Sequence, residues 1–454
     1  MTVVQRTLIK DTVNKIGQEV TVKGWVKTRR DHGKLVFLDI VDSSGVIQVL
    51  APGTDKNVSE LRTQYVVSIE GTVHKRPEHL RNKKIPTGDI EIQPHVNGIK
   101  ILAKSDVLPF DLDQEELHLE LPTLLDFRAL TLRHPKVQSI FKVQEAVMEG
   151  FRRAAQELGC TEIFVPTISY SSTEGGAEVF RVDYYDHKAF LIQSPQLYKQ
   201  MMVPVFERVY LTSHAYRAEP SVTTRHLSES TQLDCELGFV EFEDLLDAIE
   251  FVGKKTIGYA SEFQYDALSM FGVEMPILSV KTPRLTLKEA QEIIFKRTKR
   301  DVRNEQDLSP EDEREISAWG LEEHGSDLVT ITHFPTKKRA FYTQPDPADP
   351  TYSLSYDLLF RGIEVLSGSK RIHDYETLKK VIEERGMDTT NFGMYLQAFK
   401  YGMPPHGGFS FGLERITMKI LNLGNIREAS LFPRDMERID ERLSIHTKES
   451  NTAK

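Results

Sequence analysis

The chain has 454 residues, of which 39% are hydrophobic and 28% are charged, and its mean hydropathy is -0.36. A chain of this length exceeds one ordinary domain, so we expect at least two. The composition excludes a disordered and a membrane-spanning protein. The sequence has no run of about 18 apolar residues and no signal-peptide core, so we expect a cytoplasmic protein without a membrane partner. The net charge of -9 argues against a general nucleic-acid coat, although local basic clusters matter more than the total.

The cysteines and the basic clusters limit the chemistry further. Cys160 and Cys235 are too few for a disulfide framework or a zinc site, so we expect both to be structural. Basic residues cluster near the N-terminus in residues 27–30 (KTRR) and 74–84 (HKRPEHLRNKK). Either cluster suits a nucleic-acid contact, and a solvated charged surface is the alternative.

The region from residue 17 to residue 104 has the pattern of a small β-structure. Apolar and polar residues alternate in short runs, which are separated by turn residues such as 42–45 (DSSG). The runs predict five strands, at residues 19–26, 35–40, 46–50, 66–73 and 89–93. Five short strands suggest a small barrel, and the OB-fold is the commonest such barrel that binds nucleic acid.

The rest of the chain changes to a mixed helical and extended pattern. The polar, acidic stretch 111–120 predicts a hinge, and residues 134–158 carry apolar side chains at helical spacing until Gly159 ends the helix. Further runs predict strands at 162–165, 189–192, 208–211 and 233–239, and helices at 245–259 and 281–304. We therefore expect an α+β protein in four parts: a barrel domain at 1–105, a hinge at 106–130, a larger domain at 131–445 and a polar tail at 446–454.

The strongest local signal is the run 216–229 (YRAEPSVTTRHLSE). It places the basic groups of Arg217, Arg225 and His226 in a loop between two strand-like runs, together with the carboxylate of Glu219. A guanidinium group holds phosphate and carboxylate through its fixed fork of donors. The whole run indicates an anion-binding surface, although a lone Arg-x-Glu would carry no weight.

A glycine-rich segment near the C-terminus indicates a second anion site. Residues 407–415 read GGFSFGLER and lead into an apolar run at 416–423. Glycine lets the backbone approach a ligand closely, and Arg415, one turn into the following helix, would reach a triphosphate. The segment is not a Walker loop, because no Gly-Lys-Ser/Thr follows. The alternative is a turn before a core helix with an incidental arginine.

Two further segments carry candidate ligands for a metal ion and for a substrate anion. Asp357 and Glu364 are seven residues apart with apolar neighbours, so both would point into one cleft from adjacent strands. Paired carboxylates of this kind hold Mg2+ on substrate phosphates. Lys199, in the run 193–199 (QSPQLYK), would pair with an anionic substrate group. The alternatives are a structural role for the carboxylates and an exposed surface position for the lysine.

Together these strings resemble the catalytic core of the class II aminoacyl-tRNA synthetases, and most closely the aspartyl-tRNA synthetases of the archaeal type. The resemblance implies an antiparallel catalytic sheet flanked by helices, an anticodon-binding OB barrel, and a homodimer formed through motif 1 at about residues 135–166. It extends from Gly24 to Asp435, and its landmarks follow in the family's order: GWV, FRALTLRHP, TEGG, QSPQLYKQ, RAE with TTRHL, the Asp357 and Glu364 segment, FKYGMPPHGG, GLER and NIREASLFPRD.

The resemblance assigns the ATP and metal contacts by position. The implied catalytic residues are Arg217 and Arg415: the first binds the ATP α-phosphate and the aspartate α-carboxylate and offsets charge that develops at phosphorus, and the second holds the γ-phosphate. The implied ATP contacts are Arg217, Glu219, His226, Glu364, Gly412 and Arg415. The implied ligands of the cofactor Mg2+ are Asp357, Glu364 and Ser367.

The resemblance also assigns the amino-acid pocket and the substrate. Lys199 and Arg371 aim two cations at the substrate side chain, which favours a carboxylate, because asparagine would leave them underpaired at a cost of several kcal/mol. Asparaginyl enzymes differ at the QSPQLYK position, so we expect aspartate. The implied aspartate contacts are Glu174, Gln196, Lys199, Arg217, Asp234, Ser367 and Arg371.

The implied reaction has two steps. The aspartate carboxylate attacks the ATP α-phosphate to give aspartyl-adenylate and pyrophosphate, and the terminal 3′ hydroxyl of tRNA(Asp) then takes the aspartyl group. Positioning and electrostatics suffice, without a protein nucleophile. The alternatives are an asparaginyl-tRNA synthetase and a non-catalytic, RNA-binding paralogue. The second is disfavoured by the intact set Arg217, Glu219, Asp357, Glu364 and Arg415.

The barrel carries the implied anticodon contacts. Phe37 matches an aromatic residue that stacks on an anticodon base, with a core phenylalanine as the alternative, and Gln48 and Glu91 match readers of base edges. Some enzymes of this family charge tRNA(Asp) alone, and others, with relaxed specificity, also charge tRNA(Asn). The choice stays open here, because Lys27 matches the residue typical of neither group, while Pro86 slightly favours relaxed specificity. The full implied set is Lys27, Arg29, Phe37, Gln48 and Glu91.

Three positions depart from the family's pattern. Pro220 follows Glu219 where an acidic residue is usual, and Ser369 and Ser410 replace glycines. Each adds a side chain close to the expected path of the ligand. None of the three changes removes a charged catalytic group.

Overall fold

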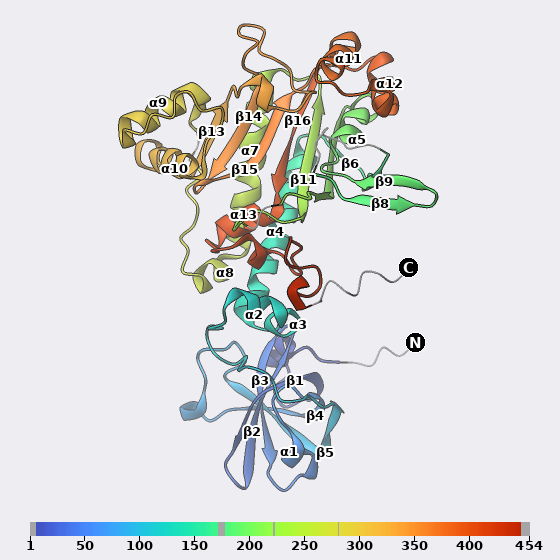
Figure 1. Cartoon of the computed structure of the whole chain (residues 1–454). Helices are drawn as coiled ribbons and strands as arrows, with labels where there is room; N and C mark the ends of the chain where they lie inside the picture. The colour runs from blue at the N-terminus through green and yellow to red at the C-terminus, as the bar shows by residue number, and fades with distance from the viewer. Residues whose placement is uncertain (1–5, 171–177, 221–222, 280, 446–454) are drawn as a thin grey trace. The chain divides into compact units, whose positions relative to one another are not determined.

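The computed structural model describes residues 6–170, 178–220, 223–279 and 281–445. Contacts divide the chain into two compact units, Met1–His118 and Leu119–Lys454. Helices and strands carry the labels of Figure 1. In the described part of the chain, no helix is both long enough and apolar enough to cross a membrane.

The first unit is a closed five-stranded barrel with the strand order β1-β2-β3-β5-β4. The strands β3 and β5 are parallel, and the other neighbours are antiparallel. All five predicted strands are confirmed, and the closed topology is that of an OB-fold. The strands are β1 (Glu19–Asp31), β2 (Leu35–Asp42), β3 (Gly45–Pro52), β4 (Val66–Lys75) and β5 (Ile90–Ala103), and the short helix α1 (Lys56–Glu60) precedes β4 in the chain.

Apolar residues at alternate positions build the core of the barrel. In β2 the side chains of Val36, Leu38 and Ile40 are buried, whereas Phe37 and Asp39 between them are only partly covered. This period of two is the pattern that a strand with one buried face requires. The inner residues of the barrel join in one apolar cluster made mainly of valine, isoleucine and leucine.

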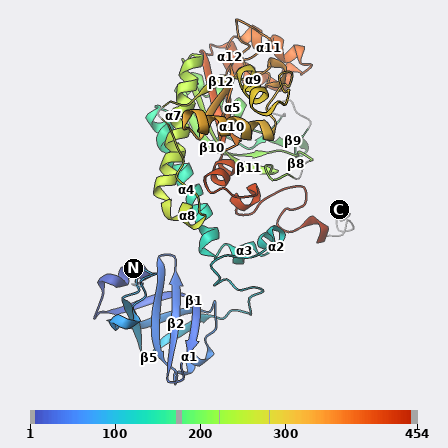
Figure 2. The same cartoon turned by 90° about the vertical axis from the view of Figure 1, so that its left-hand side faces the viewer.

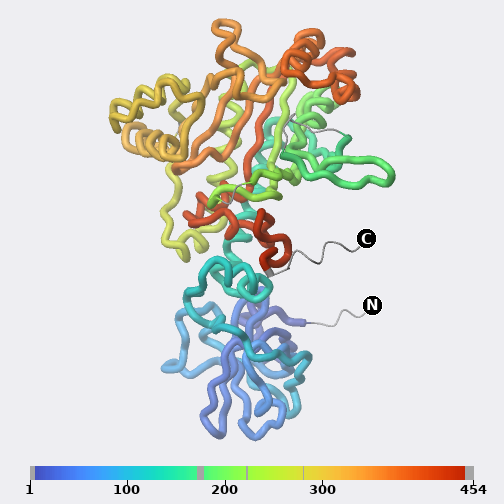
Figure 3. The backbone as a smooth tube through the Cα atoms, in the orientation of Figure 1, coloured from blue at the N-terminus to red at the C-terminus, as the bar shows by residue number. Residues whose placement is uncertain are grey.

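The second unit is built on an eight-stranded sheet with the order β12-β13-β14-β15-β16-β11-β10-β6. Its central strands are antiparallel, and the edge pairs β12–β13 and β10–β6 are parallel. The strands β11 and β16 are neighbours although they lie far apart in the sequence (Figure 3). The strands of this sheet are β6 (Thr161–Glu162), β10 (Arg208–Tyr216), β11 (Glu229–Gly238), β12 (Arg284–Thr286), β13 (Leu328–Thr332), β14 (Ser355–Phe360), β15 (Ile363–Lys370) and β16 (His406–Gly412).

Two long helices, α4 (Pro135–Glu157) and α7 (Phe242–Phe263), run side by side and pack on one face of this sheet (Figures 1 and 2). Both helices are confirmed predictions. The first begins with a proline in its first turn and ends before Gly159, whose φ is +76°. The main apolar core of the unit lies between the two helices and the sheet. The opposite face of the central strands is therefore available for a ligand.

Three predicted elements differ from the structure. The predicted helix 281–304 is helical only at α9 (Leu287–Thr298), because Thr286 forms a capping box with Glu289 and the three residues before the helix form β12. The predicted strand 162–165 is reduced to β6. The predicted strand 189–192 belongs to a separate sheet of β7 (Ile168–Ser169), β9 (His187–Leu191) and β8 (Arg181–Tyr184).

Residues 111–120 contain neither helix nor strand, and two short helices, α2 (Leu121–Asp126) and α3 (Arg128–Thr131), follow them. The guanidinium group of Arg128 is buried and donates hydrogen bonds to the carbonyls of Glu428, Ser430 and Leu431 at 2.7–3.0 Å. The helix α3 therefore packs within the second unit, whereas residues 111–118 belong to the first. The other helices are α5 (Gln196–Met201), α6 (Val203–Phe206), α8 (Tyr265–Met270), α10 (Pro310–His324), α11 (Tyr375–Glu384), α12 (Gly393–Lys400) and α13 (Leu413–Ile420).

Candidate active site

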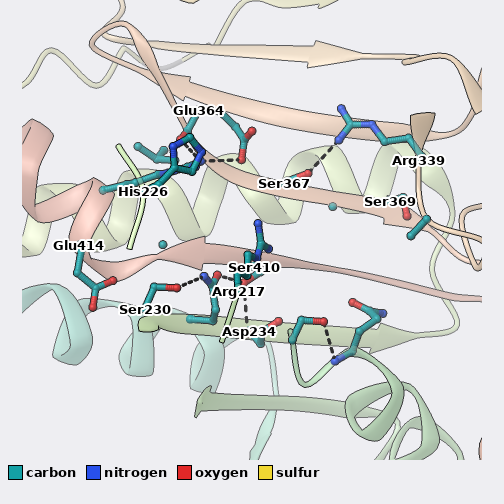
Figure 4. Close-up of a pocket in the computed structure, with 18 of the residues that line it drawn as sticks. Arg217, His226, Ser230, Asp234, Arg339, Glu364, Ser367, Ser369, Ser410 and Glu414 are labelled. Atoms are coloured by element: carbon teal, nitrogen blue, oxygen red, sulfur yellow. Dashed lines mark hydrogen bonds and ion pairs between the residues drawn. The ribbon is translucent and has the colours of Figure 1, made fainter. Parts of the chain in front are cut away.

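A cavity of about 370 Å³ in the second unit brings together most of the residues that the sequence singles out (Figure 4). Asp357 does not line the cavity, but its carboxylate accepts a hydrogen bond from Arg339, which lines it. Glu174 lies outside the described residues. The predicted residues that line the cavity are Gln196, Lys199, Arg217, Glu219, His226, Asp234, Glu364, Ser367, Arg371, Gly412 and Arg415.

Four buried charges, which we term the charge cluster, meet on one side of the cavity: Lys199, Asp234, Glu236 and Arg371. The Lys199 Nζ donates to Asp234 Oδ1 at 2.7 Å and lies 3.4 Å from Glu236 Oε2. The Arg371 guanidinium donates from Nε and Nη2 to the two Glu236 oxygens, at 2.9 and 3.3 Å. Each of the four side chains is at most 4% exposed. Two cations and two anions therefore balance in the protein itself.

Local structure explains why these charges converge. Asp234 and Glu236 are two residues apart on β11, so they share one face of the strand, while Cys235 between them points into the main core. Lys199 comes from α5, and Arg371 follows β15. The backbone of β16 passes close by: a Cβ on Gly408 would lie 2.1 Å from the Glu236 carboxylate. Glycine is therefore required at that position.

The charge cluster differs in one respect from the expectation of two cations open to a substrate. Asp234 and Glu236 already neutralise Lys199 and Arg371. Burial alone would raise the pKa of Glu236, but Arg371 and then Lys199 outweigh it, so the pKa lies below its usual value. The pKa of Asp234 is shifted the other way, because burial raises it against the opposing charge of Lys199. The hydrogen bonds nevertheless form a pre-formed network, and a substrate carboxylate would share its cations with these two acids.

The two serines that replace glycines take part in this network. Arg371 Nη1 donates to Ser369 Oγ at 2.6 Å. Ser410 Oγ donates to Gln232 Oε1 at 2.7 Å and lies 3.3 Å from Asp234 Oδ2. Figure 4 shows Ser410 and Asp234 side by side. Both hydroxyl groups therefore orient charged residues of the site.

The outer part of the cavity is lined by the connection between β10 and β11. Glu219 lies between two cationic groups, with its carboxylate 3.8 Å from Arg217 Nη1 and 3.8 Å from His226 Nε2. Burial lowers the pKa of His226. Arg225 donates to Glu313 of α10 at 2.6 Å, which ties this loop to the helix. The Arg217 side chain is 46% exposed, so its guanidinium group remains accessible to a ligand.

The predicted metal ligands come from two adjacent strands. Asp357 of β14 and Ser367 of β15 are direct cross-strand partners, and a register shift brings Glu364 to the same region of β15. Such a bulge lets residues at an odd spacing share one face. Figure 4 shows Glu364 and Ser367 along this strand. The three oxygen-bearing side chains therefore lie on one region of adjacent strands, with Glu364 and Ser367 lining the cavity and Asp357 buried behind it.

The buried carboxylate of Asp357 fits a cation. Its Oδ1 is buried and receives no hydrogen bond from the described residues. Burial raises the pKa of Asp357 to about 7, against the opposing charge of Arg339. Among the described residues, no three His, Cys, Asp or Glu side chains gather at one point. A carboxylate oxygen without a hydrogen-bond donor is a ligand of the kind that Mg2+ takes, together with water and substrate phosphate.

Several residues of the site were missed by sequence reasoning. Arg339 and Glu236 bind predicted residues directly, and Gln232 and Glu414 line the cavity. The alternation in LDCELG was a usable signal for Glu236, because it follows Asp234 by two in a strand. Arg339 stands in the basic run TKKR and had no local signal, since its partner Asp357 is 18 residues away.

The outer face of the barrel brings together three of its predicted residues. Phe37 lies outside the apolar cluster of the barrel, so the alternative of a core phenylalanine is wrong. Asp39, two residues after Phe37 on β2, lies opposite Gln48 of β3, and Gln48 lies opposite Glu91 of β5. The Gln48 amide donates to Glu91 Oε2 at 3.2 Å. Phe37, Gln48 and Glu91 thus lie on the same side of neighbouring strands, but Gln48 and Glu91 are buried, at 9% and 6% exposure.

The other two predicted barrel residues lie on β1. Arg29 is paired with Asp31 at 2.9 Å. Lys27 falls where the register with β2 shifts, between Val26 and Thr28. A bulge of this kind re-aims the side chain that it carries.

Comparison with known proteins agrees with both units. A family model described as OB-fold nucleic acid binding domain matches residues 20–102, and one described as tRNA synthetases class II (D, K and N) matches residues 120–436. The chain belongs to this class II tRNA synthetase family.

Its similarity to individual members covers nearly the whole chain. It is 40% identical to the aspartate–tRNA(Asp/Asn) ligase of Thermus thermophilus, over 96% of this chain and 99% of that protein. It is 38% identical to the aspartate–tRNA(Asp) ligase of Pyrococcus furiosus, over 93% and 96%. A solved structure of asparaginyl-tRNA synthetase from Pyrococcus horikoshii with asparaginyl-adenylate matches with a TM-score of 0.86 at 29% identity, over 96% of this chain and all of that one.

Glu414, in the motif GLER, lies in the first turn of α13 and links this helix to the strand β11. The carboxylate accepts the backbone N–H of Thr231 with both oxygens, each at 3.1 Å. Burial raises the pKa of Glu414 to about 7 from an ordinary value of 4.5. The folded protein therefore binds this proton more tightly than the unfolded chain does, and the contribution to stability falls as pH rises from about 4.5 to about 7.

We expect Glu414→Gln to remove this pH dependence, because glutamine keeps an acceptor and stays uncharged. The unfolding free energy of the variant minus that of the wild type should rise by up to about 3 kcal/mol between pH 5 and pH 8. Urea unfolding across this pH range measures the difference, with the exposed Glu262→Gln as the matched control. Parallel curves for wild type and Glu414→Gln would contradict the assignment.

Proposed function

We propose that the protein is an aspartate–tRNA ligase, which activates L-aspartate with ATP and transfers it to the 3′ end of tRNA(Asp). The observation that carries the proposal is the charge cluster, which sets Lys199 and Arg371 beside a cavity lined by Arg217 and Arg415. The names of the curated relatives support the same activity.

Selection of aspartate follows from the donors that the cluster presents. Lysine and arginine side chains have only donors, and a carboxylate has only acceptors. The substrate β-carboxylate would therefore accept from Lys199 and Arg371 alongside Asp234 and Glu236, whereas the NH2 group of an asparagine side chain would place a donor against these donors. Gln196 and Asp234 would receive the substrate ammonium group, and Glu174 is proposed to join them.

Activation of the amino acid would depend on the cations near the cavity mouth. Arg217 would hold the substrate α-carboxylate and the α-phosphate in line for attack and would offset the charge that develops at phosphorus. Arg415 would bind the γ-phosphate, and Glu219 and His226 would contact the adenine and the phosphates. Gly412 ends β16 directly before α13, where the backbone would approach the nucleotide.

Asp357, Glu364 and Ser367 would hold Mg2+, which neutralises phosphate charge when bound. The support is their position on adjacent strands and the buried Asp357 Oδ1, which receives no hydrogen bond from the described residues. The remaining ligand positions would be filled by phosphate and water, as this ion prefers.

The proposal also covers the organisation of the chain. Residues 1–105 would be the anticodon-binding domain, 106–130 the connection, and 131–445 the catalytic domain. A homodimer through α4 and β6 is supported by Phe164, which follows β6 and is 89% exposed. The cytoplasm is the location that this function implies.

An asparaginyl-tRNA synthetase is the second candidate, because solved structures of that enzyme share the fold of this chain. Amino-acid-dependent exchange of pyrophosphate into ATP separates the two. We expect aspartate to support exchange with a kcat/KM at least about a hundredfold above that of asparagine, since a mismatched polar group is left buried. Exchange with asparagine alone would reject the pocket assignment. Absence of exchange with either, with tRNA still bound, would indicate a non-catalytic paralogue.

We expect Phe37→Leu to raise the KM for tRNA(Asp) about tenfold, because base stacking on an aromatic ring contributes about 1–3 kcal/mol. Phe37→Tyr keeps the ring and should behave as the wild type, and aspartate-dependent exchange should be unchanged in both. Equal KM values in all three proteins would remove Phe37 from the anticodon surface. Charging tRNA(Asn) in the same assay decides whether specificity is strict or relaxed.

A further inference from the structure

Arg339 lines the cavity but has no role in the activity proposed above. It directly follows a short 3-10 turn (Thr336–Lys338), and its guanidinium group stacks 3.9 Å from the ring centroid of Phe334. The Arg339 carbonyl accepts a hydrogen bond from Arg385 Nη1 at 2.8 Å. Both the backbone and the side chain are therefore held in place.

The guanidinium group of Arg339 contacts two of the three proposed metal ligands. Its Nη2 donates to Asp357 Oδ2 at 2.6 Å. Its Nη1 donates to Ser367 Oγ at 3.3 Å, a contact that Figure 4 shows. The other Asp357 oxygen, Oδ1, receives no hydrogen bond from the described residues. One guanidinium group thus pairs with one oxygen of the carboxylate, and the other oxygen, which is buried, has no hydrogen-bond partner among the described residues.

We propose that Arg339 is a resident counter-cation of the metal site, which weakens the binding of a divalent ion alone and so couples entry of the metal to entry of the nucleotide. The inference rests on the metal site of the proposed function. A metal ion at Asp357 Oδ1 would lie within a few ångströms of the guanidinium charge. Repulsion between like charges at such a distance is stronger in a protein than in bulk water, and it is larger for a dication than for a single charge.

Glu364, the second carboxylate proposed as a metal ligand, is also paired with a guanidinium group. Arg415 Nη1 lies 3.4 Å from Glu364 Oε1, so two carboxylates face two guanidinium groups before any ligand binds. A nucleotide triphosphate brings several negative charges to this region. These charges would offset the repulsion and draw Arg415 from Glu364, so the metal ion and the nucleotide would each favour entry of the other.

On this account Arg339 acts as a positioning residue. Its hold on Asp357 Oδ2 and Ser367 Oγ keeps both oxygens oriented while the site is empty of nucleotide. The Asp357 carboxylate uses only Oδ2 in this contact, so Oδ1 would be the oxygen that binds the metal ion. The cost of this arrangement is weak binding of the ion alone.

Binding of Mn2+ to the nucleotide-free protein tests the proposal, with free Mn2+ measured by electron paramagnetic resonance. We expect Arg339→Met to bind Mn2+ at least about tenfold more tightly than the wild type, because one positive charge is removed. Arg339→Lys keeps the charge and should bind as weakly as the wild type. Arg339→Gln is neutral but retains a donor, and it should show the same gain as the methionine variant.

Arg361 provides a matched control. It also pairs with a mostly buried acid, Asp327, at 3.2 Å and also lies over a phenylalanine ring, but it is absent from the cavity lining. Arg361→Met should leave Mn2+ binding unchanged. Adding Asp357→Asn to Arg339→Met should abolish the gain and so locate the bound ion.

The proposal is overturned if neither neutral variant binds Mn2+ more tightly than the wild type, or if the gain survives Asp357→Asn. Thermal unfolding of each variant shows that the compared proteins are folded. The measurement needs neither an amino acid nor tRNA. A failure of aspartate activation would therefore be distinguishable from a failure of this inference.

Discussion

The buried contact between two cations and two acids at the amino-acid end of the cavity constrains the rest of the site. Lys199, Asp234, Glu236 and Arg371 come from a helix, a central strand and the end of another strand. Breaking a buried pair by removing one partner costs about 3–5 kcal/mol, because an uncompensated charge remains. The register of β11 against β16 and the absence of a side chain at Gly408 follow from the need to keep these groups in contact.

Charge balance extends from this cluster to the metal end of the cavity. There Arg339 and Arg415 face Asp357 and Glu364, so the ligand-free site keeps its cations paired with its own acids. On the proposed function, ligand binding would be an exchange of partners: substrate anions would take the arginines, and cationic groups would take the carboxylates. Polar groups fixed before the reaction stabilise developing charge without reorganisation, which is the usual source of catalysis in such sites.

The parts of this structure that the sequence predicted are those encoded locally. The five barrel strands and the helices α4 and α7 follow from apolar periodicity, and most site residues follow from ordered motifs. The residues that escaped prediction act across distance: Glu236 meets Arg371 across 135 positions, and Arg339 meets Asp357 through a turn without a motif. The helix predicted at 281–304 was too long because a capping threonine, Thr286, sets its start.

The central claim is that the charge cluster selects a carboxylate side chain. The affinities of two non-reactive analogues, aspartyl- and asparaginyl-sulfamoyl adenosine, can be measured by calorimetry. They test this claim without turnover or tRNA. The account predicts that the aspartyl analogue binds at least about a hundredfold more tightly, because only its side chain matches the donors of Lys199 and Arg371. Equal affinities, or a preference for the asparaginyl analogue, would contradict it.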